Sequence, residues 1–170
     1  DLAEATQEEV YFYWQGLGYY TRARSLHATA RLVMEKFNGR FPEKREDVLK
    51  LKGIGPYTVA SFLALAFNQP ETVVDGNVIR VISRLFRLTE PVSEILPQIR
   101  EKAAGLTDRT RPADYASAIM DLGAMICTPK NPQCLLCPWQ EHCLSKTDPE
   151  LEEIPRRGKP AKKVKNGYVY

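Results

Sequence analysis

The chain has 170 residues, of which 44% are apolar and 26% charged, and its net charge is +3. This balance excludes an intrinsically disordered chain, the length suffices for one domain or two small lobes, and the charge alone does not indicate a nucleic-acid partner. No apolar run reaches the roughly 20 residues that cross a bilayer, so we expect no membrane partner.

The chain opens with an acidic segment, DLAEATQEEV, that lacks the pattern of a signal peptide. We therefore expect a reducing, cytoplasmic compartment, where disulfides are rare. Both ends look cut: the first residues enter directly into a helical pattern, and the last, NGYVY, alternate like the start of an unpaired strand. We expect the chain to be the interior of a longer protein.

Two helices are predicted first. Thr6, with Glu9 three residues later, forms a capping box that starts a helix ending at Gly16 or Gly18. The second helix ends at Asn38-Gly39. Its apolar stripe consists of Leu26, Ala30, Val33 and Phe37.

Helical patterns continue through most of the remaining chain. We expect helices over 42–51, 56–67, 76–88, 93–104 and 111–126. In the third of these the apolar face carries Val78, Ile82 and Leu85. Strand signals are confined to the last residues, so the predicted fold class is all-α. The segment RRGKPAKKVK (156–165) holds six positive charges and belongs to a basic linker, 146–170.

The segment LKGIGPYTVA (51–60) predicts a tight turn between two short helices. Gly53 and Gly55 leave backbone N–H groups uncovered, and Pro56 begins the second helix. The turn and the start of the second helix would therefore direct several N–H donors to the same side, an arrangement that can bind a phosphate. Ile54 would anchor the turn in the core. A plain helix–helix turn without a ligand fits these ten residues as well.

All four cysteines of the chain lie within CTPKNPQCLLCPWQEHC (127–143). The compartment disfavours disulfides, and structural zinc usually takes two C-x2-C pairs separated by a longer insert. Four thiolates in so short a loop suit a compact [4Fe–4S] cube. The spacing favours iron–sulfur over zinc without excluding zinc.

These elements together resemble one family. The glycine hairpin, VVDGNVIRV (73–81) and the cysteine loop, in this order, resemble the helix-hairpin-helix DNA glycosylases of the endonuclease III superfamily. WQGLGYYTRARSLHATA (14–30), VDGNVIRV and MDLGAMICT (120–128) resemble its adenine-specific MutY branch. LKGIGPYT is more similar to Gram-positive bacterial members than to enterobacterial ones, so we expect a bacterial, nucleoid-associated protein. We also expect it to be a monomer.

The resemblance implies the fold and its modules. We expect a two-lobed helix-hairpin-helix glycosylase fold with a helical barrel-like module over 1–90, which contains the hairpin at about 42–67. A cluster module follows over 91–145, and the basic linker 146–170 leads towards a missing C-terminal domain that recognises 8-oxoguanine.

The resemblance also assigns DNA contacts and cluster ligands. It implies that the hairpin holds a DNA phosphate with a monovalent cation, and that Tyr19 wedges the duplex beside the damaged pair. From the residues alone, the adjacent Tyr19 and Tyr20 could instead be core residues. The DNA-contacting set is Leu17, Tyr19, Gly53, Ile54, Gly55 and Lys130. The ligands of the [4Fe–4S] cluster would be Cys127, Cys134, Cys137 and Cys143. The loop would serve structure and DNA docking.

For catalysis the resemblance points to Asp75, Asn77 and Tyr57. Asp75 would stabilise the positive charge that develops on the sugar, with Asn77 close by. From local sequence alone, Asp75 is as readily an N-cap of the helix that follows it. Tyr57 stands where bifunctional relatives carry a lysine nucleophile, so we expect a monofunctional enzyme that releases its base by attack of water.

One part of the family pattern is missing. The general acid of the family is a glutamate on an earlier helix, and no EIMLQQT-like motif occurs in the 170 residues. The expected function is removal of adenine opposite 8-oxoguanine or guanine in double-stranded DNA by base flipping and hydrolysis of the N-glycosidic bond. The alternatives are a related monofunctional mismatch glycosylase, such as a thymine-specific one, and a non-catalytic DNA-binding or redox iron–sulfur module.

Overall fold

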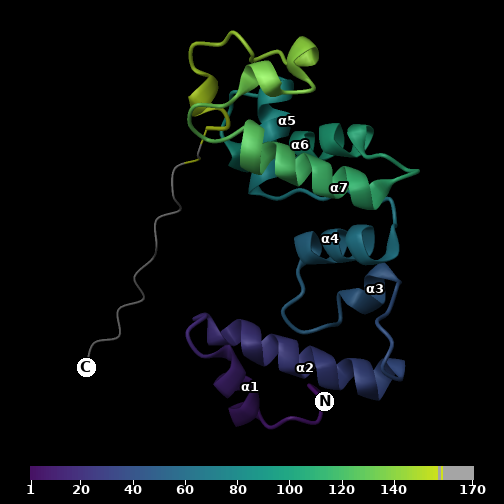
Figure 1. The fold of residues 1–170 in the computed structure, drawn as a ribbon. Coiled ribbons are helices and arrows are strands. Elements are labelled where there is room, and N and C mark those ends of the chain that lie inside the picture. Colours follow the sequence, from purple (N-terminus) through teal and green to yellow (C-terminus); the bar gives the residue numbers. More distant parts are fainter. Residues whose placement is uncertain (157, 159–170) are drawn as a thin grey trace. The chain divides into compact units, whose positions relative to one another are not determined.

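The computed structural model describes residues 1–156 and 158, which form two compact units. The first comprises Asp1–Val73 and Thr107–Ser117, and the second Val74–Leu106 together with the described residues from Ala118 onward. Within these described residues the regular structure is helical and no strand occurs, which confirms the all-α class (Figure 1). None of the helices there is long and apolar enough to cross a membrane.

Four helices and the start of a fifth build the first unit. They are α1 (Gln7–Trp14), α2 (Tyr20–Phe37), α3 (Arg45–Val48), α4 (Pro56–Phe67) and the first part of α7 (Pro112–Asp121). In Figure 1, α1 runs beside α2, against which it packs. The short α3 is all that forms of the helix expected over 42–51, and α4 has the predicted limits.

The core of the first unit joins α2, α3 and α4. Its buried members are Val33, Val48, Leu51, Val59 and Leu63. Ile54, in the turn between α3 and α4, packs against this cluster, as expected. The turn is therefore fixed to the core by its central residue, while Gly53 is exposed and Gly55 is partly buried.

The capping box at the start of α1 is present. Thr6 N donates to Glu9 Oε2 at 2.7 Å, and Glu9 N donates to Thr6 Oγ1 at 3.2 Å. These contacts lower the pKa of Glu9, the backbone N–H of Thr6 most of all. The helix ends at Trp14, before the predicted glycines.

The apolar stripe predicted for α2 is only partly buried. Val33 is buried, whereas Leu26 is 46% exposed. The buried face instead includes Ala23, His27 and Thr29. Thr29 Oγ1 donates to the carbonyl oxygen of Lys52 at 3.1 Å, next to the hairpin glycines. Small and polar residues can face a packed backbone segment, and a search for apolar periodicity overlooks them.

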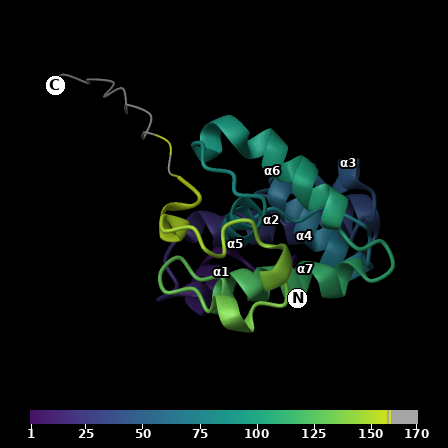
Figure 2. The same ribbon diagram turned by 90° about the horizontal axis from the view of Figure 1, so that it is seen from above.

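The second unit is built on α5. The unit contains α5 (Gly76–Leu85), α6 (Val92–Leu106), the end of α7 and the π-helical turn η1 (Leu122–Ile126), followed by the short 3₁₀ turns η2 (Cys134–Leu136), η3 (Gln140–His142) and η4 (Leu151–Glu153). Both ribbon views show the segment after α7, coloured green to yellow, running beside α5 (Figures 1 and 2). Val78, Ile82 and Leu85 are buried, which confirms the predicted face of α5.

This division differs from the modules expected over 1–90 and 91–145. The units separate between Val73 and Val74. The helix α5 lies in the same unit as the cysteine loop, and it packs against α6 and against η1, which directly precedes that loop. The expected basic segment (156–165) and terminal strand lie outside the described residues, apart from Arg156 and Gly158.

Candidate functional site

Asp75 is held by its own helix start. It is the N-cap of α5: its Oδ1 accepts from Val78 N at 2.7 Å, and its Oδ2 accepts from Asn77 Nδ2 at 3.2 Å. The helix dipole places partial positive charge beside the carboxylate. Acting as the N-cap holds the half-buried carboxylate in one orientation. The N-cap and the catalytic interpretation of Asp75 are therefore compatible. Together with Gly76 and Asn77 it lines an open pocket of the second unit.

Arg80, one turn along α5, connects this pair to the cysteine loop. Its Nη2 donates to Asn77 Oδ1 at 2.8 Å, and its Nε donates to the carbonyl oxygen of Cys127 at 2.7 Å. A further bond of 2.5 Å runs from Nη2 to the carbonyl oxygen of Gly123. Burial, first of all, lowers the pKa of Arg80, and charge interactions with Cys127 and Asp75 oppose that shift.

Gly123 fits against Asn77 because it has no side chain. A Cβ at this position would lie 2.6 Å from Asn77 Cβ and 3.0 Å from its Cα and carbonyl oxygen. Such distances do not occur between unstrained atoms, so any other residue must push Asn77 or η1 away. Arg80 and Gly123 were given no role from the sequence. Arg80 lies in VDGNVIRV and Gly123 in MDLGAMICT, two of the motifs that carry the family resemblance. Their place in these motifs is what could have pointed to them.

The four cysteines line one cavity. About 340 Å³ of empty space, including its opening to solvent, lies among them, bounded also by Arg84 and Lys146. Two tight turns shape the loop: Cys137 N donates to the carbonyl oxygen of Cys134 at 3.2 Å, and Cys143 N donates to that of Gln140 at 3.4 Å. All four cysteines are unpaired and partly buried. The donor set therefore fits a four-cysteine cluster.

Two of the four cysteines have shifted pKa values. Burial, first of all, raises the pKa of Cys137 and of Cys143, and the neighbouring thiols raise both further. In the described residues no three His, Cys, Asp or Glu side chains are arranged to hold a single metal ion. A cubane cluster has a different requirement, because each cysteine binds its own iron.

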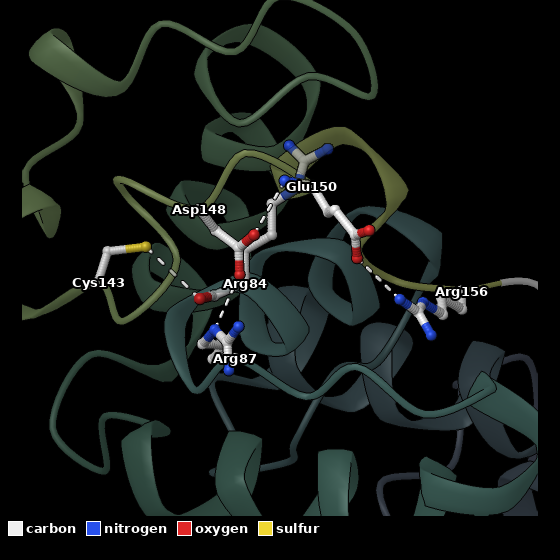
Figure 3. A network of polar contacts seen from close by, with 6 residues as sticks. All are labelled: Arg84, Arg87, Cys143, Asp148, Glu150 and Arg156. Carbon is white, nitrogen blue, oxygen red and sulfur yellow. Dashed lines mark hydrogen bonds and ion pairs between the residues drawn. The ribbon is translucent and has the colours of Figure 1, made fainter.

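Arg84 holds the loop from the far end of α5. Its side chain is 1% exposed, and its guanidinium donates to the carbonyl oxygens of Thr128 at 2.7 Å, Pro129 at 3.0 Å and Ile154 at 2.9 Å. Nη1 lies 3.5 Å from Cys127 Sγ. Figure 3 shows the Cys143 thiol directed at the backbone of Arg84, where Sγ lies 3.5 Å from the carbonyl oxygen. A single residue thus contacts both ends of the cysteine loop.

A strap of residues 144–156 continues from the loop (Figure 3). One ion pair attaches it to a residue just after α5, and a second joins two of its own residues. Arg87 Nε donates to Asp148 Oδ2 at 2.8 Å, and Arg156 Nη2 donates to Glu150 Oε2 at 2.8 Å. The N–H of Glu150 and then Arg87 lower the pKa of Asp148. Asp148 therefore joins the strap to Arg87, two residues after the end of α5.

The hairpin lies in the first unit and has the expected form. Gly53 has φ +74°, and a Cβ there would lie 2.6 Å from Ser25 Cβ, so both conformation and space require glycine. Gly55 is the N-cap of α4 with Pro56 in the first turn, which leaves backbone N–H groups without intrahelical partners. Tyr57, next in the chain, is 46% exposed.

The loop between α1 and α2 exposes two apolar side chains. Leu17 is 66% and Tyr19 79% exposed. Tyr19 has φ +47°, in the left-handed region, which costs a non-glycine residue about 1 kcal/mol. Tyr19 is therefore not a core residue.

Lys130 is exposed in the cysteine loop. The structure brings together Asp75 with Asn77, and the four cysteines with one another. Tyr57, Tyr19 and the hairpin belong to the first unit.

Comparison with known families assigns both parts of the chain. Residues 1–104 match the family described as HhH-GPD superfamily base excision DNA repair protein. Residues 127–143 match the iron–sulfur binding domain of endonuclease III. The second match confirms the iron–sulfur interpretation of the cysteine loop over zinc and disulfides: the cofactor is a [4Fe–4S] cluster.

Curated relatives are adenine DNA glycosylases. The human one is 40% identical over 93% of this chain and 30% of its own length, and the rat one 43% identical over 84% and 28%. One from Buchnera aphidicola is 33% identical over 90% of this chain and 44% of its own. The chain thus spans less than half the length of these relatives.

Solved structures agree on the fold. A thermostable thymine-DNA glycosylase superposes with a TM-score of 0.75 at 29% identity, covering 85% of this chain and 68% of that one. A non-covalent endonuclease III–DNA complex gives 0.69 at 25% identity, covering 85% and 67%. With its helical units, glycine hairpin and cysteine loop, the chain belongs to the HhH-GPD superfamily of base excision DNA repair proteins.

Proposed function

We propose that this chain is the DNA-binding and base-removing part of an adenine DNA glycosylase that excises adenine paired with 8-oxoguanine or guanine. The observation that carries the proposal is the identity of 33–43% with adenine DNA glycosylases from human, rat and Buchnera over 84–93% of this chain. The oriented carboxylate of Asp75 in an open pocket supports it from the structure.

Cleavage of an N-glycosidic bond builds positive charge on the sugar. The carboxylate of Asp75, fixed by the N–H groups of Val78 and Asn77, stabilises that charge without having to reorient. Water then attacks the sugar, and a second acid protonates the departing base. We expect that acid to be a glutamate, for which no motif occurs among the 170 residues. When bound, the cluster supplies four iron–thiolate bonds that tie the loop together, and no step of base removal runs through it.

Tyr57 makes the enzyme monofunctional. A phenol cannot form a Schiff base with the sugar, so the product is an abasic site and the strand remains intact. Treatment of the reacting complex with borohydride is expected to trap no covalent adduct. An adduct at Tyr57 would contradict this assignment.

DNA contacts come from several parts of the chain. The uncovered N–H groups around Gly53, Ile54 and Gly55 hold a phosphate together with a monovalent cation, and Lys130 meets a second phosphate. The exposed Tyr19, with Leu17 beside it, fills the gap that the flipped base leaves. The chain binds as a monomer. Lys130→Ala is expected to weaken binding and to reduce its salt dependence.

Binding is the first test, because the expected acid has no counterpart among the 170 residues. The chain is titrated with duplexes that carry a non-cleavable adenine analogue opposite 8-oxoguanine, the same analogue opposite thymine, or a T·G mismatch. Because recognition of 8-oxoguanine is expected from a further C-terminal domain, we expect both analogue duplexes to bind at least about tenfold more tightly than the T·G duplex, which corresponds to about 1.4 kcal/mol. Equal affinity for all three would leave only the non-catalytic DNA-binding module.

The likeness to a solved thymine-DNA glycosylase favours one second candidate. A thymine-specific enzyme would prefer the T·G duplex in the same titration. Base release by the longer protein that contains this chain then separates the two, since the product is either adenine or thymine. The Asp75→Asn variant is expected to bind the preferred duplex normally and to release neither base.

A further inference from the structure

The loop that exposes Leu17 and Tyr19 has an unusual backbone. It joins α1 to α2, and Gly16, Gly18 and Tyr19 have φ values of +85°, +65° and +47°. Two of these residues are glycines, for which positive φ is easy, but Tyr19 is not. No side-chain hydrogen bond caps the start of α2 at Tyr19. Another contact must hold Tyr19 in this conformation.

That contact comes from Trp14, the last residue of α1. Its indole Nε1–H donates to the carbonyl oxygen of Gly18 at 2.9 Å. The peptide between Gly18 and Tyr19 is a rigid plane, so ψ of Gly18 and φ of Tyr19 change when that plane rotates. Fixing the carbonyl oxygen fixes the plane. It thereby fixes the left-handed φ of Tyr19 and the direction in which its ring leaves the backbone.

The ring of the same indole holds a cation. The guanidinium carbon of Arg22 lies 5.9 Å from the centroid of the Trp14 ring, within the range of a cation–π contact. Arg22 N also donates to the carbonyl oxygen of Tyr19 at 2.8 Å. Arg22 is exposed, so its charge stays available to a ligand beside the two exposed apolar side chains.

We propose that Trp14 is a positioning residue for the DNA-inserting loop. Through its N–H it holds Tyr19 in the conformation that enters the duplex, and through its ring it keeps Arg22 where a backbone phosphate meets it. This inference rests on the proposed function, because it requires Tyr19 to enter DNA. Trp14 itself touches no base.

A purely structural role makes different predictions. Trp14 is half-buried at the contact between α1 and α2, where Val10 is buried as well. If Trp14 only packed these helices together, its substitution would lower stability and leave the action of the folded loop unchanged. The test therefore needs a readout of base unstacking in addition to stability.

The test compares Trp14→Phe with the unsubstituted chain. Phenylalanine keeps an aromatic ring for packing and removes the N–H donor. The probe is a duplex with 2-aminopurine opposite 8-oxoguanine, whose fluorescence rises when the base unstacks. We expect Trp14→Phe to weaken the binding that produces this rise about fivefold, as for loss of one hydrogen bond. Its affinity for an undamaged duplex should change less than about twofold.

Tyr19→Ala shows whether Trp14 acts through Tyr19. If it does, adding Trp14→Phe to Tyr19→Ala causes no further loss, because coupled residues are not additive. Trp14→His restores a ring N–H at a similar distance from the backbone and is expected to recover part of the fluorescence rise. If Trp14→Phe loses helix content, Trp14→His replaces it in the comparison. Tyr13→Phe is the matched control: this neighbour is 84% exposed, and the substitution should leave the signal unchanged.

Two results would overturn the inference. One is a fluorescence rise that Trp14→Phe leaves unchanged, and the other is full additivity of Trp14→Phe with Tyr19→Ala. No rise with the unsubstituted chain overturns the proposed function, and the inference with it, so the two failures are distinguishable.

Discussion

Individual residues make the contacts that align the candidate site. Asp75 and Asn77 are two positions apart, yet the orientation of Asn77 depends on Arg80 and on Gly123, which lies on another element. The carboxylate is therefore fixed from two directions, by its own helix and by η1. Changes far from Asp75 in the sequence should affect it.

Gly123→Ala is expected to disturb this arrangement. The added Cβ would lie 2.6 Å from Asn77 Cβ, and overpacking of this kind costs about 1–3 kcal/mol of unfolding free energy. Urea unfolding measures that loss, and under the proposed function base release should fall further than stability explains. The matched control is Gly105→Ala, because a Cβ at Gly105 meets nothing within 4 Å and α6 favours alanine. Equal effects of both variants would contradict the contact.

Arg84→Met is expected to release the cysteine loop. It leaves the carbonyl oxygens of Thr128, Pro129 and Ile154 without their donor, and each buried unsatisfied group costs about 1–3 kcal/mol. Iron content and visible absorption should fall. Arg87→Met is the control, because its side chain is 57% exposed and solvent screens its ion pair, so iron content should stay unchanged. Full iron retention in Arg84→Met would rule out this role.

At the scale of elements, α5 is the common support. Its start carries Asp75, its middle donates to Cys127 and Gly123 through Arg80, and its end holds the loop and the strap through Arg84. A ten-residue helix thus fixes both the candidate catalytic carboxylate and the cluster loop. The fold needs no separate scaffold for each.

The strap 144–156 should loosen in acid. The pKa of Asp148 is lowered in the folded protein by the N–H of Glu150 and by Arg87. Its contribution to stability is therefore complete above the unfolded aspartate pKa, about 3.9, and is lost as pH falls through the lower folded value. Hydrogen exchange of the Ile154 amide, which donates to Leu151, reports strap opening. Asp148→Asn should flatten the pH dependence, and an unchanged profile would argue against Asp148.

At the scale of the whole molecule, two units have separate sources of stability. The first has the apolar core around Leu63 and Val59. The second adds to its helices a loop that depends on bonds between cysteines and iron, and metal binding of this kind contributes directly to folding.

Removal of iron should therefore act on one unit first. Treatment with an oxidant and a chelator is expected to raise hydrogen exchange around Cys137, Arg84 and the strap, while the amides of α4 around Leu63 remain protected. Cys137→Ser should reproduce this pattern. Simultaneous loss of protection in both units would show that they unfold as one.

The sequence alone determined the elements whose causes are local. The capping box at Thr6, the apolar face of α5, the limits of α4 and the grouping of four cysteines depend on residues a few positions apart, so periodicity and spacing revealed them. The tertiary structure decided what depends on distant partners. Arg84 reaches carbonyl groups 44 to 70 positions away, Gly123 packs against Asn77, and Leu26 is exposed while Thr29 faces the hairpin. Such contacts leave no periodic trace, because a guanidinium or a missing side chain is recognised only against the backbone that it meets.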